Sequence, residues 1–397
     1  MKKQLHTPEG VRDLVGRECE RKHIIDHKIK ETIQSYGYEQ IETPTFEYFD
    51  IFSQKIGSIP SKDLYKFFDR EGDTLVLRPD VTPAIARAYS NYFQGQAPIR
   101  LFYSGNVYIN YSSLQGRLKE TTQIGAEFIG DTSIEADAEM VSMAVEALKA
   151  TGLSEFTISI GHTGFLKGLL EACHFSAEEE EIVRELILNK NFFGLDDLLS
   201  RVDDNDKLRE LYASLGKLFM EPSHMAELKA LVLDYPYIQE SFAYIEQLYE
   251  LLELYGVAEH VAFELGLVSS YRYYTGILFC GYTFGSGEAI LKGGRYDGLL
   301  SFFGRDEPAI GFAILSDQLS LALDRQKITI PIAGIHRAYL YTKDTVKDAI
   351  RLSQQDRTDG MRVRLFRLPD GEDQITELED RLKKDGIEIV RLQDGWR

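Results

Sequence analysis

The sequence has few cysteines and no long apolar run. Its three cysteines, Cys19, Cys173 and Cys280, lie far apart in 397 residues, which fits neither a disulfide framework nor a metal-binding spacing. No stretch approaches the roughly 18 apolar residues of a membrane helix, and residues 1–6 are not followed by the apolar segment of a secretory signal. We therefore expect a cytoplasmic protein with reduced thiols, no membrane segment, no metal and no cofactor.

Basic residues are scarce relative to acidic ones. The chain has 45 lysines and arginines and 63 aspartates and glutamates, so its net charge is −18. Nucleic-acid binding draws much of its affinity from cations that neutralise phosphates, and such proteins usually carry a basic patch. The charge balance therefore argues against tRNA or another nucleic acid as a ligand.

The hydrophobic fraction of 44% allows a sizeable buried core, and the length suggests two or three domains. Residue periodicity predicts a core domain over 1–325, interrupted by a helical insertion at about 163–256. Residues 336–397 predict a small C-terminal α/β domain, because strand and helix patterns alternate there.

Within the core, the pattern predicts helices near 18–36 and 135–151 and a long antiparallel hairpin over 99–108 and 123–129. Further strands are expected at 38–42, 73–78, 156–160, 262–268, 277–281 and 288–291. Gly293 and Gly294 are expected to break the chain after the last of these strands.

Four segments place polar and aromatic residues in a distinctive order. They are Arg78–Pro79–Asp80–Val81–Thr82; the hairpin strand Gly105–Tyr111 with its loop Gln115–Arg117 and return strand Gln123–Glu127; the runs Leu267–Gly276 and Lys292–Leu299; and, more weakly, Gly311–Ile314. In order and spacing they resemble the core of the histidyl-tRNA synthetases over about 1–160 and 257–325. The resemblance implies an α+β fold, with a class II aminoacyl-tRNA synthetase-like antiparallel sheet flanked by helices.

The same resemblance implies a histidine-binding pocket. Asp80, Thr82 and Gln123 occupy positions that would hold the α-amino group of the ligand. Glu127 and Tyr274, with Tyr273 beside them, occupy positions that would hold the imidazole. These residue types suit the ligand, because free histidine presents an ammonium group and a ring that donates and accepts hydrogen bonds.

Three positions depart from the synthetase pattern. Ile109, Ser269 and Gln318 stand where synthetases carry arginines that act on ATP and on the substrate carboxylate. Arginine stabilises phosphate charge with a permanent charge and a planar fork of donors, and one such group is often worth several kcal/mol in a transition state. We therefore expect no catalytic residues and no amino-acid activation.

A synthetase-like chain with these losses resembles the family of ATP phosphoribosyltransferase regulatory subunits. The resemblance implies a non-catalytic subunit in the first step of histidine biosynthesis. Its partner would be a short-form catalytic subunit, with the chain forming a homodimer inside a hetero-oligomer and L-histidine acting as the feedback ligand. The 336–397 domain is smaller than a synthetase anticodon-binding domain, which also speaks against tRNA binding.

Other interpretations of the sequence remain open. A working histidyl-tRNA synthetase would need other residues to replace the three arginines. A tRNA-sensing module derived from a synthetase would need a local basic face. A related enzyme that makes a different adenylate meets the same objection as the synthetase. Taken singly, Tyr273, Tyr274 and Glu127 could also be ordinary structural residues.

Overall fold

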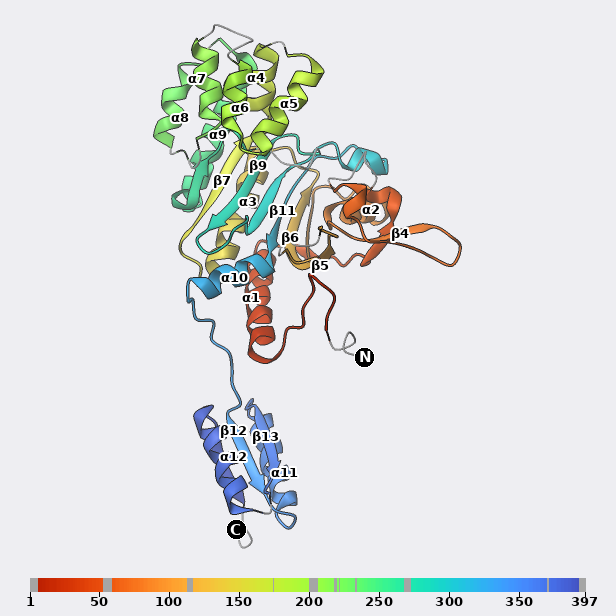
Figure 1. Cartoon of the computed structure of the whole chain (residues 1–397), viewed down its shortest axis with the longest axis vertical. Coiled ribbons are helices and arrows are strands. Elements are labelled where there is room, and N and C mark those ends of the chain that lie inside the picture. The colour runs from red at the N-terminus through yellow and green to blue at the C-terminus, as the bar shows by residue number, and fades with distance from the viewer. Residues whose placement is uncertain are drawn as a thin grey trace. The chain divides into compact units, whose positions relative to one another are not determined.

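The computed structural model describes residues 6–52, 59–112, 117–173, 175–199, 206–217, 220, 222–232, 234–267, 273–369 and 371–392. The chain divides into two compact units, Met1–Ile330 and Pro331–Arg397 (Figure 1). Among the helices of these ranges, none is long and apolar enough to cross a lipid bilayer.

An eight-stranded sheet forms the middle of the first unit, in the order β1-β5-β6-β11-β10-β9-β7-β8. The strands are β1 (Glu39–Gln40), β5 (Ile99–Tyr108), β6 (Glu120–Ile129), β7 (Phe156–His162), β8 (Val261–Phe263), β9 (Ile277–Thr283), β10 (Leu291–Arg295) and β11 (Ala309–Leu315). The two outermost pairs are parallel. Every inner pair is antiparallel.

Helices α1 (Gly16–Ser35) and α3 (Ile134–Ala150) cover one face of this sheet, with α10 (Ser316–Arg325) beside them. In α1, Ile25, Ile29 and Ile33 are fully buried, and their four-residue spacing places them on one helical face. The main core lies between these helices and the alternate strand residues that point toward them. The opposite face of the sheet is therefore left for the helix α2 and for a cleft.

Helix α2 (Thr82–Tyr92) follows β4 directly, and Pro83 lies in its first turn, where the missing N–H of proline is harmless. Strand β4 (Thr74–Leu77) lies between β2 (Phe46–Tyr48) and β3 (Lys66–Phe68) in a separate three-stranded sheet. The apolar side of α2 packs against β5 in a second core cluster that includes Tyr296.

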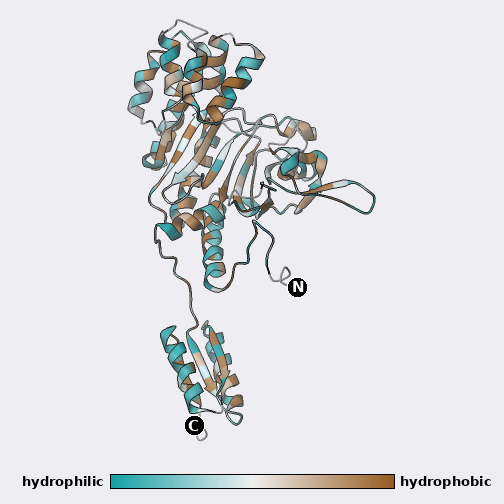
Figure 2. Cartoon of the chain, in the orientation of Figure 1, coloured by the Kyte–Doolittle hydropathy of each residue, from teal (hydrophilic) through white to brown (hydrophobic). Residues whose placement is uncertain are grey.

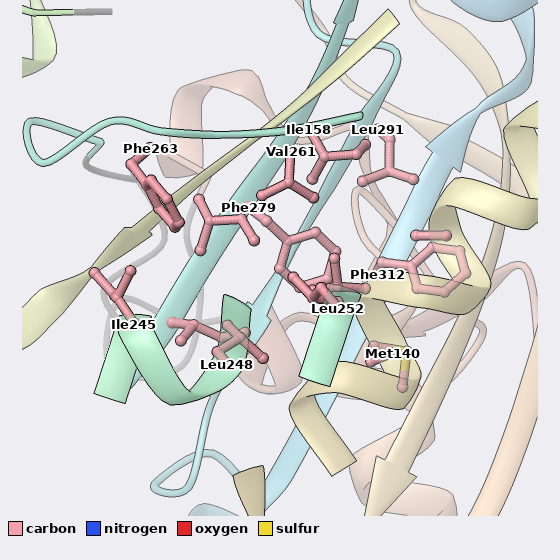
Figure 3. Packing of buried hydrophobic residues seen from close by; sticks show 14 of the residues in the cluster. Met140, Ile158, Ile245, Leu248, Leu252, Val261, Phe263, Phe279, Leu291 and Phe312 are labelled. Carbon is pink, nitrogen blue, oxygen red and sulfur yellow. The ribbon is translucent and has the colours of Figure 1, made fainter. Parts of the chain in front are cut away.

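In the described residues between β7 and β8, six helices form an insertion (Figure 1). They are α4 (Thr163–Ala172), α5 (Ala177–Leu188), α6 (Phe192–Leu199), α7 (Asp206–Ser214), α8 (Pro222–Lys229) and α9 (Pro236–Leu254). Figure 2 shows apolar and polar stretches alternating along these helices, as expected for helices with one buried face. Helix α9 joins the insertion to the sheet, because Ile245, Leu248 and Leu252 pack in the same cluster as Phe279 (Figure 3).

The second unit has a parallel three-stranded sheet in the order β13-β12-β14. Its elements are β12 (Arg337–Tyr341), α11 (Val346–Thr358), β13 (Val363–Arg367), α12 (Glu372–Lys384) and β14 (Glu388–Leu392). Inside it, Arg337 donates to both carboxylate oxygens of Asp356 at 2.9 Å. This ion pair joins the first strand of the unit to its first helix.

The expected fold class is confirmed, since the chain has a large, mainly antiparallel sheet flanked by helices. The prediction for Gly293 and Gly294 is wrong, because both lie inside β10. Side chains there would collide with the rings of Phe279 and Tyr274. Strand β8 is also shorter than predicted and ends at Phe263.

Candidate functional site

A cleft opens on the face of the central sheet that α1 and α3 leave uncovered. Strand register defines this face: Glu127 on β6 pairs with Gly311 on β11, and Gly311 pairs with Gly294 on β10. Alternate residues of a strand lie on the same face of the sheet. These three positions, together with the residues two before and two after each of them on its strand, therefore form the floor of the cleft. The cleft measures about 1000 Å³ with its open mouth included.

All six residues predicted to bind histidine lie around this cleft, and each has a polar or aromatic side chain. The cleft is lined by Asp80, Thr82, Gln123, Glu127, Tyr273 and Tyr274. They come from the N-terminus of α2, from β6 and from the segment before β9. The structure thus brings together residues that are almost 200 positions apart in the sequence.

Glu127 is the deepest of these groups, with 1% of its surface exposed. Thr82 Oγ1 donates to one carboxylate oxygen at 2.7 Å, and Tyr296 OH donates to the other at 2.5 Å. Burial raises the pKa of Glu127 to about 8, and the nearby charge of Asp80 adds to that effect, while the two hydroxyl donors oppose it. At neutral pH this carboxyl therefore holds its proton much of the time.

Asp80 is the second buried carboxyl of the cleft. Tyr273 OH donates to its Oδ2 at 3.2 Å, and the Thr82 N–H lies 3.4 Å from its Oδ1. Burial raises the pKa of Asp80, against the opposing effect of these donors. Two carboxyls in one buried pocket favour a ligand that brings positive charge or N–H donors.

Aromatic rings form the wall beside the two carboxyls. The rings of Tyr273 and Tyr274 are 5.0 Å apart, and those of Tyr273 and Tyr296 are 5.8 Å apart in an edge arrangement. Tyr296 was not among the predicted site residues, although it belongs to the 292–299 motif. Its role as a hydrogen-bond donor to Glu127 follows from the three-dimensional structure, because the two residues are far apart in the sequence.

Gln123 lies on β6, four residues before Glu127 and on the same face of the strand. Its side chain is buried, and its Oε1 has no hydrogen-bond partner within the described part of the chain. A buried amide oxygen costs free energy unless a donor reaches it. The ammonium group of a bound amino acid is a donor of the required kind.

The floor of the cleft depends on glycine. A Cβ added to Gly311 would lie 1.7 Å from Glu127 Oε2, so any side chain there would displace the carboxylate. A Cβ on Gly294 would lie 2.8 Å from the ring of Tyr274. Glycine at these two positions therefore makes room on this face of the sheet for the Glu127 carboxyl and the Tyr274 ring.

The positions expected to have lost arginine lie toward the other end of the cleft. Ile109 and Gln318 both line it, and neither side chain carries a charge. Ser269 falls outside the described residues. Arg295, although close to the floor, pairs with the buried Asp137 and donates to the Asp131 carbonyl at 2.9 Å. Its charge is thus used to hold β10 against α3.

Within the described ranges, no group of three or more histidine, cysteine, aspartate or glutamate residues could hold a metal ion. The cleft instead combines two buried carboxyls, a buried amide, three tyrosine rings and a glycine floor. Such a pocket can bind a small cationic molecule with a flat ring. It offers no arginine for a phosphate at Ile109 or Gln318.

Comparison with known proteins gives a consistent family. The family model of histidyl-tRNA synthetase matches residues 10–319. The ATP phosphoribosyltransferase regulatory subunit of Ruminiclostridium cellulolyticum is 38% identical over 392 residues, which cover 98% of this chain and 93% of that protein. The regulatory subunit of Acetivibrio thermocellus is 38% identical over 365 residues, covering 91% and 86%.

Solved structures agree with the sequence relatives. A crystal structure described as an ATP phosphoribosyltransferase regulatory subunit/histidyl-tRNA synthetase from Bacillus halodurans has a TM-score of 0.85 and 32% identity, over 97% of both chains. The histidyl-tRNA synthetase of Nostoc has a TM-score of 0.81 at 18% identity, over 98% of this chain and 91% of that one. At that identity the second likeness supports the fold alone.

Proposed function

This chain belongs to the family of ATP phosphoribosyltransferase regulatory subunits, and from that premise we propose that its cleft binds L-histidine as a feedback signal. In this role the chain is a non-catalytic subunit of the first enzyme of histidine biosynthesis. It activates a short-form catalytic subunit and makes that subunit sensitive to histidine.

One observation carries the histidine proposal. The end of the cleft expected to hold the amine and the imidazole has polar side chains that can bind them, whereas the end expected to hold phosphate has no arginine at Ile109 or Gln318. Glu127, held by Thr82 and Tyr296, presents a carboxyl with a pKa of about 8. Such a group exchanges a proton readily with an imidazole, whose own pKa is about 6.5. Asp80 and the Gln123 amide oxygen supply acceptors for the ammonium group.

The second part of the proposal is that synthetase activity is lost. Adenylate formation concentrates negative charge on phosphate oxygens, and arginines normally stabilise it. Ile109 offers no donor at all, and Gln318 offers only a dipole. Because both positions line the same cleft, we expect no exchange of pyrophosphate into ATP in the presence of histidine.

A ligand in the cleft regulates a partner only if it binds two states of the assembly unequally. We therefore propose a homodimer of this chain within a hetero-oligomer that contains the catalytic subunit, with histidine favouring the less active arrangement. The assembly is expected in the cytoplasm. The net charge of −18 supports the further expectation that tRNA is not a ligand.

The direct experiment mixes the full chain with a short-form catalytic subunit and follows phosphoribosyl-ATP formation. We expect the rate to rise on mixing and to fall when histidine is added. An unchanged rate on mixing would overturn the proposed role. Robust histidine-dependent exchange of pyrophosphate into ATP by the chain alone would overturn the proposed loss of synthetase activity.

A further inference from the structure

The cleft also contains cations, and their placement bears on how a ligand would lie in it. Among the described residues that line the cleft, the cations are Arg117, Lys119 and Lys292. Arg117 is already engaged, because its guanidinium lies 2.7 Å from Glu288 and 5.2 Å from the centre of the Tyr111 ring. Lys119 and Lys292 form no salt bridge within the described part of the chain.

Strand register separates these two lysines. Lys119 immediately precedes β6, eight residues before Glu127. At the rise of an extended chain, eight residues span about 27 Å. Lys292 lies on β10 opposite Ala313 of β11, and Ala313 lies opposite Gly125 of β6. It is thus two strand spacings across and two residues along from Glu127, or about 12 Å.

That separation suits one amino acid. The strand positions of Glu127 and Lys292 are about 12 Å apart, and the exposed side chain of Lys292 can bring its ammonium group nearer to a ligand held at Glu127, whereas Lys119 lies more than twice as far away along the strand. Strand β11 lies between them, with Ala313 opposite Lys292 and with Gly311, whose missing side chain makes room for the Glu127 carboxyl. Gln123 is a third group on this face: it lies two strand spacings from Lys292 and, on β6, two residues before Gly125, the residue in register with Lys292.

Charge points the same way. The deep end of the cleft holds the two buried carboxyls of Glu127 and Asp80, which can accept hydrogen bonds from the ammonium group and the ring but offer no positive charge to the carboxylate of an amino acid. With isoleucine at position 109, the described floor of the sheet offers one cation within reach of that carboxylate. The side chain of Lys292 is exposed on this floor, so its ammonium group can swing toward a ligand.

We propose that Lys292 binds the carboxylate of the amino acid held in the cleft and fixes its orientation, with the ring at Glu127 and the carboxylate toward β10. This assignment rests on the proposed histidine pocket. It makes Lys292 a specificity residue, because the chain would distinguish histidine from molecules that share its ring and amine but lack its carboxylate.

The test compares two ligands on the full chain by isothermal titration calorimetry. L-Histidinol keeps the ring and the amine of histidine but has a hydroxymethyl group in place of the carboxylate. A charge-assisted hydrogen bond at a partly exposed site corresponds to about tenfold in affinity, so the wild-type chain should bind histidine about tenfold more tightly than histidinol. The variant Lys292→Gln should lose that preference, with little change for histidinol.

Lys167→Gln is the matched control, because it removes one positive charge from an exposed position on α4 that does not line the cleft, and it should change the affinity for neither ligand by more than about twofold. A preference retained in Lys292→Gln, or an equal loss for both ligands, overturns the role of Lys292 and leaves the pocket proposal standing. Absence of histidine binding to the wild-type chain overturns the pocket proposal itself.

A second measurement covers the case in which Lys292→Gln does not fold. In the wild-type chain, raising sodium chloride from 0.05 to 0.5 M should weaken histidine binding more than histidinol binding, because only histidine pairs with an exposed cation. Equal salt dependence for the two ligands contradicts the proposal.

Discussion

Replacing Glu127 with glutamine should change how the stability of the first unit depends on pH. Burial raises the pKa of Glu127 in the folded chain from 4.5 to about 8. Between these values the unfolded chain has released the proton and the folded chain keeps it. The free energy of unfolding of the wild-type chain therefore falls as pH rises through this window.

The size of the effect follows from the shift. Each pH unit of difference corresponds to about 1.4 kcal/mol, so the window amounts to about 4–5 kcal/mol. Glutamine keeps an oxygen acceptor for Thr82 or Tyr296 but has no proton to lose. Relative to the wild type, Glu127→Gln should therefore gain about 4 kcal/mol in the free energy of unfolding between pH 5 and pH 8.

Urea unfolding followed by far-ultraviolet circular dichroism measures this difference at equal protein concentration. The comparison between variant and wild type cancels the titration of the other groups. The dependence of the free energy on urea should stay the same in both proteins, which shows that the unfolded states are comparable. A variant-minus-wild-type difference that stays constant within about 1 kcal/mol from pH 5 to pH 8 would refute the reasoning.

Three further substitutions probe the cleft and its support. Gly311→Ala should weaken histidine binding more than tenfold in calorimetry, because the new methyl group displaces Glu127; Gly287→Ala, with no atom within 4 Å of its new Cβ, is the control and should bind normally. Tyr296→Phe removes a hydroxyl donor from the buried carboxyl and should lower the free energy of unfolding by about 1–3 kcal/mol, measured with urea at pH 7; no change would mean that this contact is dispensable. Asp137→Asn removes the buried charge partner of Arg295 and leaves only the half-exposed Asp297 paired with it. It should cost about 3 kcal/mol in the same assay, and a loss below 1 kcal/mol would contradict that assignment.

The sequence predicted the hairpin β5–β6 well, because both strands are long and regularly patterned. That regularity also placed Gln123 and Glu127 on one face, since they are four residues apart on a strand. The short strands β2 and β3 were missed, because three residues give too little periodicity to distinguish a strand from a loop. Lys292 begins one of the motifs that carry the resemblance, but the sequence assigned it no role, since its position relative to Glu127 depends on the pairing of β10 with β11 and of β11 with β6.

Gly293 and Gly294 illustrate a different failure. Glycine usually weakens a strand, so the pair predicted a break. In the folded chain the sheet continues through both residues, because the ring of Phe279 on one face and that of Tyr274 on the other occupy the space of their missing side chains. Local propensity cannot reveal this, since the contacts come from residues that are 14 to 20 positions away.

The most direct test of the account measures phosphoribosyl-ATP formation by the reconstituted assembly while histidine is titrated. The account predicts that the wild-type chain raises the activity of the catalytic subunit and that histidine then lowers it. With Asp80→Asn, which removes an acceptor for the ammonium group, half-inhibition should need at least about tenfold more histidine. Equal half-inhibitory concentrations of histidine for the wild-type chain and for Asp80→Asn would contradict the claim that histidine acts through this cleft.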